Sequence, residues 1–225
     1  MILNNSNYEN NINFEKNNIH LWVIENKVAF FNFVKVLNSQ INGEIGEFIL
    51  SKNLNEMPIS KNICMLLDFF NIDFNNKNIL NGIIKKLEIE LQENDYIIKL
   101  NELNAQILNF LYSIGLSINL DISYNDELEF VKLLKTYDIK ITNQSSSLIE
   151  TIINYIEVLI ELNICKILVF VNLKQYLSYE EIIELYKYVN YKNFKIFLIE
   201  NTNSKKIEDE KKIIIDNDLC EILVS

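Results

Sequence analysis

Residues Lys166–Val171 read KILVFV, and every residue after the lysine is apolar. A run without polar alternation is typical of a strand in a parallel sheet that is covered on both faces. A second apolar strand is predicted at 195–199, and between the two Ser178 and Glu181 form a capping box that predicts the start of a helix. A strand, a helix and a strand of this length predict a right-handed βαβ crossover and therefore an α/β fold.

The same pattern extends outward from KILVFV. A capping box of Ser147 and Glu150 precedes an apolar stripe of helical spacing. Residues 19–24 are predicted to form a buried strand that feeds a largely buried helix over 28–37. The apolar residues at 213–215 and 221–224 are predicted to complete the edge of the sheet.

The middle third of the chain is helical by its spacing and interrupts the α/β pattern. Its apolar residues step by three and four positions in two runs, which predicts two long helices packed as an antiparallel pair. The two runs are Leu80, Ile83, Ile84, Leu87 and Leu91, then Leu100, Leu103, Ile107, Phe110 and Ile114. We therefore predict an α/β head from residues 1–60 and 136–225, with an all-helical leg inserted at 61–135.

Composition narrows the classes of function. The 225 residues carry a formal net charge of −10, and all 21 basic residues are lysine. The sequence has neither a secretory signal nor an apolar run of membrane-spanning length, which predicts a soluble cytoplasmic protein without a membrane partner. It has a single histidine, His20, and no Gly-rich phosphate-binding motif. These features argue against an enzyme, and a relic of a nucleotide-dependent ATPase or kinase is the weakest alternative.

An acidic segment follows the predicted leg helices. Oxygen-bearing side chains stand at 121, 123, 125, 126, 127 and 129, and calcium binds six to eight oxygen ligands. The segment begins like an EF-hand loop but has Asp126 where that loop needs glycine and Lys132 where it needs glutamate. The residues leave two interpretations open: an irregular cation site completed by another segment, or a solvated helix start with acids near its N-terminus.

The lysines are equally ambiguous by themselves. Lys132, Lys135 and Lys140 follow the acidic segment, and Lys35 lies on the polar face of its predicted helix. A surface with a net charge of −10 repels nucleic acid unless positive charge is segregated on it. Composition alone therefore argues against DNA binding.

Several strings, in this order, resemble the ring-forming accessory adaptation protein of type II-A CRISPR systems in its short form. The resemblance covers residues 14 to 224. The strings are LLDFFNIDFNN at 66–76, LDISYNDE at 120–127, KTYDIKI at 135–141, QS at 144–145, KILVFVN at 166–172, IFLIE at 196–200 and IDND at 215–218.

The resemblance implies an α/β head with the topology of P-loop ATPases but without their nucleotide site, and a helical leg. It implies a non-enzymatic homotetrameric ring around double-stranded DNA that acts in spacer acquisition, in the prokaryotic cytoplasm, with other CRISPR adaptation proteins and the effector nuclease. A scaffold with little DNA binding of its own is the alternative.

The resemblance also implies calcium ions that support the ring. Asp121, Asp126 and Glu127 are its candidate ligands, and Glu129 is added because of its chemistry. Members of the family usually have a glutamate where this chain has Lys132. The candidate DNA-binding residues are Lys35, Lys132, Lys135 and Lys140. Because these are lysines rather than arginines, sequence-blind and salt-sensitive binding is expected.

Overall fold

The computed structural model describes residues 1–93 and 95–224. The chain divides into two compact units. The head comprises residues 1–73 and 143–225, and the leg comprises residues 74–142.

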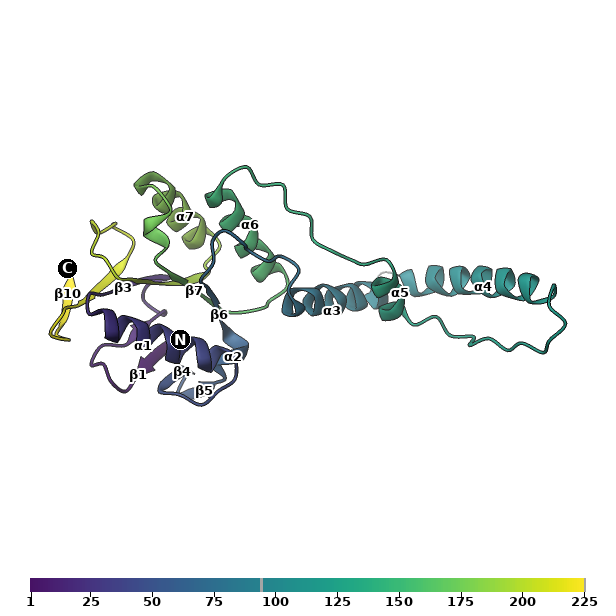
Figure 1. Ribbon diagram of the computed structural model, residues 1–225, viewed down its shortest axis with the longest axis horizontal. Coiled ribbons are helices and arrows are strands. Elements are labelled where there is room, and N and C mark those ends of the chain that lie inside the picture. Colours follow the sequence, from purple (N-terminus) through teal and green to yellow (C-terminus); the bar gives the residue numbers. More distant parts are fainter. Residues whose placement is uncertain (94, 225) are drawn as a thin grey trace. The chain divides into compact units, whose positions relative to one another are not determined.

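The head is built on a six-stranded sheet with the order β10-β9-β3-β8-β7-β6 (Figure 1). Its strands from β9 to β6 run parallel, and β10 pairs antiparallel with β9 at one edge. The mainly parallel α/β head predicted from KILVFV is confirmed. The strands are β3 (Ile19–Ile24), β6 (Ile63–Leu66), β7 (Ile167–Val171), β8 (Lys195–Glu200), β9 (Lys211–Ile215) and β10 (Glu221–Val224).

One face of this sheet packs against helix α1 (Lys27–Ile41) and a small antiparallel sheet with the order β2-β1-β4-β5. Trp22 of β3 and Phe33 of α1 lie at the centre of this core, with ring centroids 5.4 Å apart. Phe48 of the small sheet closes on Phe33 edge-to-face at 5.0 Å. The small sheet comprises β1 (Ile2–Asn5), β2 (Ile12–Asn13), β4 (Phe48–Lys52) and β5 (Asn55–Met57), and the short helix α2 (Ile59–Asn62) leads from it into β6.

Helices α6 (Leu148–Glu161) and α7 (Tyr179–Tyr191) lie on the other side of the sheet from α1 (Figure 1). Both predicted caps are present. The Ser147 hydroxyl accepts a hydrogen bond from the Glu150 backbone N–H at 3.3 Å, and Ser178 and Glu181 form a complete capping box. A short 3-10 turn, η1 (Leu173–Gln175), connects β7 to α7. The predicted β7–α7–β8 unit is confirmed as two adjacent parallel strands joined by a helix.

A buried network of charged residues joins the carboxyl ends of β7 and β8 to Glu210, which directly precedes β9. The Lys174 ammonium is 2.6 Å from the Glu210 carboxylate, which also accepts a hydrogen bond from the Tyr186 hydroxyl at 2.7 Å. Glu200, the last residue of β8, accepts a hydrogen bond from the Lys174 backbone N–H at 2.9 Å. Glu200 therefore stands at the carboxyl edge, where α/β sheets usually bind ligands, but its side chain is buried.

We expect Glu200 to make stability depend on pH. Burial raises the pKa of its carboxyl to about 7, whereas an unfolded chain leaves the value at about 4.3. Because the folded state keeps the proton to higher pH, this contribution is present below about pH 4 and is lost as the pH rises through 7. Compared with wild type, Glu200→Gln should therefore gain unfolding free energy on the order of 2–3 kcal/mol between pH 5 and pH 8.

Urea unfolding at the two pH values measures this difference. Glu208→Gln, which alters an exposed carboxylate nearby, is the control and should show no such gain. A difference between wild type and Glu200→Gln that is the same at both pH values would contradict the assignment.

The leg contains three helices, α3 (Lys77–Glu93), α4 (Tyr96–Gly115) and α5 (Phe130–Thr136). Its boundaries differ from the predicted 61–135. Ile63–Leu66 form β6, which pairs with β7 and so lies in the head. At the other end, the Asn75 side chain accepts a hydrogen bond from the Ile141 N–H at 2.8 Å and donates one to the Ile141 carbonyl at 3.0 Å. These bonds keep the chain in the leg as far as residue 142.

Helix α4 has the predicted apolar stripe but no partner that buries it. All of its residues lie in the described part of the chain, and none of them is buried. Leu103, Ile107, Phe110 and Ile114 are each 41–62% exposed. The two long helices of the leg are therefore confirmed, but the antiparallel seam predicted between them is not formed within a single chain.

Candidate metal and nucleic-acid site

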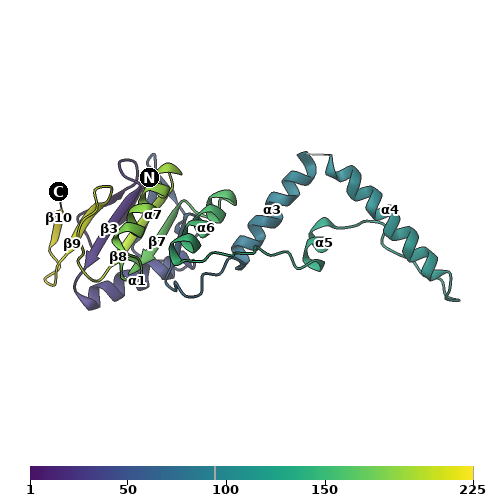
Figure 2. The ribbon, with the colours of Figure 1, turned by 90° about the horizontal axis from the view of Figure 1, so that it is seen from above.

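The acidic segment returns along α4 after that helix ends (Figures 1 and 2). The Tyr124 hydroxyl donates a hydrogen bond to the Leu111 carbonyl at 2.9 Å, and the Tyr124 ring meets that of Tyr112 edge-to-face at 5.0 Å. Further back along the helix, the Asn104 amide donates to the Asp126 carbonyl at 2.6 Å. Successive residues of the segment therefore lie beside successively earlier turns of α4, although the segment has no regular secondary structure.

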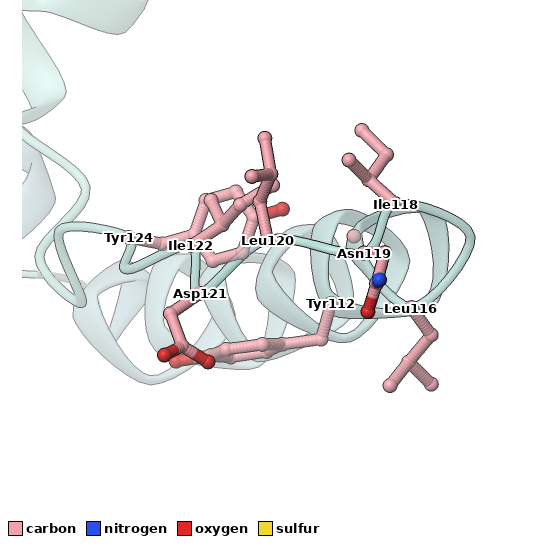
Figure 3. A pocket seen from close by; sticks show the side chains of 9 residues that line it. Tyr112, Leu116, Ile118, Asn119, Leu120, Asp121, Ile122 and Tyr124 are labelled. Atoms are coloured by element: carbon pink, nitrogen blue, oxygen red, sulfur yellow. The ribbon is translucent and has the colours of Figure 1, made fainter.

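Gly115 permits this return. A Cβ atom at that position would lie 2.7 Å from the Tyr124 hydroxyl oxygen, so a larger residue would displace the tyrosine. Near this point a hollow of about 510 Å³ lies against the end of α4. Figure 3 shows Asp121 and Tyr112 on the same side of it. Asp121 is the one candidate metal ligand among the described residues that line this hollow.

The four candidate calcium ligands are exposed and do not converge. The two anchors of the segment, at Leu111 and Asn104, are separated by about 10 Å along the axis of α4. Asp121 lies beyond the first anchor and Asp126 lies at the second. An ion that both residues bound would need their oxygens within about 5 Å of each other. In this arrangement Asp121 and Asp126 therefore do not share an ion.

The oxygen chemistry of the segment fits calcium, but the geometry of a single chain does not. Within residues 1–93 and 95–224, no three His, Cys, Asp or Glu side chains are grouped so that they could hold a metal ion. Asp126, Glu127 and Glu129 are close in sequence and offer some of the six to eight oxygens that calcium needs. The remainder would have to come from another chain or from a different conformation of the segment.

Lys132 neutralises one of these acids. Its ammonium is 2.6 Å from the Glu129 carboxylate, one turn earlier, and both side chains are more than half exposed. An exposed pair of this kind contributes about 0–1 kcal/mol to stability. The greater consequence of this pair is electrostatic. A cation that binds Glu129 must either displace the lysine ammonium or bind against its repulsion.

The other candidate DNA-binding lysines differ in their surroundings. Lys140 pairs with Asp138 at 2.5 Å, and both are exposed. Lys135, in the last turn of α5, is exposed and has no ion pair within the described residues. Lys35 is exposed on α1 and therefore belongs to the head rather than to the leg. Lys132, Lys135 and Lys140 lie on one short stretch of the leg, and Lys35 belongs to the other unit.

The sequence analysis missed a second group of lysines, in the head. Lys166 directly precedes β7 and Lys195 begins β8, so the two lie at the same edge of the sheet. Lys52 and Lys192 join them in lining a separate hollow in the head. A lysine at the start of each of two adjacent buried strands was the available signal, because parallel neighbours begin at one edge.

None of the helices in the part of the chain that the structure describes is long and apolar enough to cross a membrane. The family model described as CRISPR-associated protein (Cas_Csn2) matches residues 40–219. A curated protein from Streptococcus agalactiae named CRISPR-associated protein Csn2 is 29% identical over 157 residues, which cover 69% of each chain. The match to the family model includes the acidic segment and every candidate residue except Lys35.

Proposed function

Because this chain belongs to the Cas_Csn2 family of CRISPR-associated proteins, with its role in type II-A CRISPR adaptation, we propose that it acts as a homotetrameric ring that binds double-stranded DNA ends without regard to sequence. In this proposal calcium stabilises the ring, no reaction is catalysed, and the DNA-bound ring works with other adaptation proteins and the effector nuclease. The exposed apolar stripe of α4 is the observation that carries the proposal.

The stripe supports association between copies of the chain. Tyr96, Leu103, Ile107, Phe110 and Ile114 are spaced by seven, four, three and four positions, so they share one face of α4. All five are 41–62% exposed. A contiguous apolar face of this kind marks an interaction surface, and the spacing is that of a helix–helix seam. The returning acidic segment contacts α4 at Asn104 and Leu111, on a different face.

The lysine content supports DNA contact that ignores base sequence. Lysine binds phosphate as a point charge and lacks the bidentate fork with which arginine reads guanine. Lys35 and Lys135 are available without breaking an ion pair in the described part of the chain, whereas Lys132 and Lys140 must exchange an exposed carboxylate for phosphate. Such contacts should weaken steeply with salt.

The start of α1 supports a non-enzymatic role. In a P-loop protein the helix that follows the first strand offers its free N–H groups to phosphate. Here the Asn26 side chain accepts hydrogen bonds from the Val28 and Ala29 N–H groups at 3.0 and 3.1 Å. The donors that would hold a phosphate are therefore already used.

We assign calcium binding to the acidic segment. A single chain offers some of the oxygen ligands there but does not complete the coordination of an ion. A neighbouring copy is the natural source of the missing oxygens, because the α4 stripe would bring legs together. Each bound ion adds two positive charges to an assembly whose every copy contributes −10, so binding would also reduce repulsion between copies.

Replacing Lys132 by glutamate is expected to tighten calcium binding by about tenfold, because the change frees Glu129 and adds a carboxylate beside it. Isothermal titration of calcium into the variant and the wild type measures this. Lys135→Glu is the matched control, since it makes the same charge change on the same helix without touching the Glu129 pair. Equal affinities of wild type and Lys132→Glu, or an equal gain in the control, would contradict the role of the segment.

A specific observation also favours the scaffold alternative. Lys132 and Lys140 are paired with acids, and the chain has a net charge of −10. A ring with these properties could hold adaptation proteins together while binding DNA poorly.

Fluorescence anisotropy with a linear duplex, in calcium or chelator and at two salt concentrations, tests the proposed function. We expect binding in calcium that is equal for unrelated sequences, weaker at high salt and lost with chelator. An assembly that forms in calcium but binds no duplex under any condition would favour the scaffold and contradict the DNA-binding role.

A further inference from the structure

The head contains a hollow of about 540 Å³ at the amino-terminal edge of its sheet. Strands β6, β7 and β8 all begin at this edge, because Ile167 is in register with both Ile63 and Lys195. The walls come from the segments just before β7 and β8, from the end of β4 and from the chain after β2. A volume of a few hundred Å³ is typical of pockets for small ligands.

The hollow is basic although the chain as a whole is acidic. Four lysines line it, Lys52, Lys166, Lys192 and Lys195, against one acid among its described lining residues. That acid, Glu15, already accepts a hydrogen bond from the Met1 nitrogen at 2.6 Å. Lys52 also attracts the Glu15 carboxylate, but one acid balances only part of the positive charge of four lysines.

Lys195 is the least compensated of the four. Its side chain is partly buried, and neither Lys195 nor Lys52 has an ion pair or hydrogen bond of its ammonium group within the described residues. Burial lowers the pKa of Lys195, and the positive charges of Lys52 and Lys166 lower it further. Among the described residues, the Lys166 ammonium bonds the neutral Asn163 amide oxygen, and Lys192 has a long contact of 3.5 Å with Glu157.

A bound phosphate would relieve the repulsion between the lysine ammonium groups, because these groups bind phosphate oxygens through charge-assisted hydrogen bonds. The same hollow has apolar walls formed by Phe14, Met57, Ile160 and Phe194. Charged and apolar surfaces side by side suit a ligand that has a phosphate at one end and a flat organic group at the other.

We propose that this hollow is a binding site for a phosphate monoester of nucleotide size, with Lys195 and Lys52 as its principal phosphate contacts. The inference does not depend on ring formation or on duplex binding. A free nucleotide and the phosphorylated end of a DNA strand share the required chemistry, so the two sources are separated by experiment.

Titration calorimetry of the full chain with AMP, and with inorganic phosphate for comparison, tests the site. We expect AMP to bind more tightly than phosphate, and the double variant Lys52→Gln/Lys195→Gln to weaken AMP binding by about tenfold or more. Lys187→Gln, an exposed change on α7 outside the hollow, should leave binding unchanged. A second arm uses a short single strand with a 5′ phosphate and the same strand with a 5′ hydroxyl.

AMP binding that the double variant loses assigns the site to free nucleotides. Binding of the phosphorylated strand alone, lost in the same variant, assigns it to strand ends. Absence of binding by both, or binding that the double variant keeps, would overturn the proposal.

Acetylation of the wild-type chain makes the test independent of any variant. With the tighter of the two phosphate-bearing probes at ten times its dissociation constant, about one chain in eleven is free, so acetylation of Lys195 and Lys52 should slow by about tenfold. Acetylation of Lys187 should not change. Equal rates at Lys195 with and without the probe would contradict the site.

Discussion

Aspartate in place of both Ile107 and Phe110 should leave the protein as single chains of 26.5 kDa in calcium, where the proposed function expects an assembly. Both side chains lie on the exposed stripe of α4. An unpaired carboxylate buried in a helix–helix interface costs several kcal/mol, so two such changes exceed what an interface of this length can tolerate. Sedimentation equilibrium gives the mass directly.

The loss of assembly should be accompanied by loss of DNA binding. If encirclement retains the duplex, single chains keep only a few exposed lysine contacts, and affinity should fall by about a hundredfold or more. The matched control is Asn101→Asp with Asn109→Asp, which adds the same two charges to the same helix away from the stripe. An Ile107/Phe110 variant with the mass of the wild type would exclude the stripe as an interface.

The second large effect concerns the stability of the head. Lys174→Met should lower the free energy of unfolding by about 3–5 kcal/mol, because it leaves the Glu210 carboxylate buried without its cation. The side chain of Lys174 is 8% exposed and that of Glu210 is 0% exposed. The Tyr186 hydroxyl, 2.7 Å from Glu210, and the Ile207 backbone N–H, 3.1 Å from it, would be left as hydrogen-bond donors to that charge. A domain whose total stability is about 5–15 kcal/mol would be close to unfolding.

Urea unfolding measures the loss, and Lys187→Met on the exposed face of α7 controls for removal of a lysine. Adding Glu210→Gln to Lys174→Met should recover part of the stability, since the uncompensated charge is then absent. A Lys174→Met variant within about 1 kcal/mol of wild type would mean that the pair is not buried as described.

The local signals in the sequence predicted the head well. Each of these signals is a short pattern, and the structure it forms depends on residues that are close in the sequence. KILVFV and the run at 19–24 form strands, and the two capping boxes begin helices, as expected. Ile63–Leu66 was placed in the leg because a four-residue strand has little pattern of its own. Only its pairing with β7 identifies it as part of the sheet.

Features that depend on contacts between residues far apart in the chain could not be predicted from the sequence. Helical spacing shows that α4 has an apolar stripe but not what covers it, so the stripe was assigned to the nearest helix. The buried pair of Lys174 and Glu210 joins residues that are 36 positions apart. The acidic segment is rich in oxygen-bearing side chains, but its anchoring along α4 through Tyr124 and Asn104 could not be predicted from composition.

In the proposed assembly, copies of this chain close a ring that DNA enters by an end. The measurement that tests it most directly compares one plasmid in its closed circular form with the same plasmid cut once, at equal base-pair concentration in calcium. We expect stable binding to the cut form and little binding to the closed form. Equal binding to both forms would contradict the proposed ring.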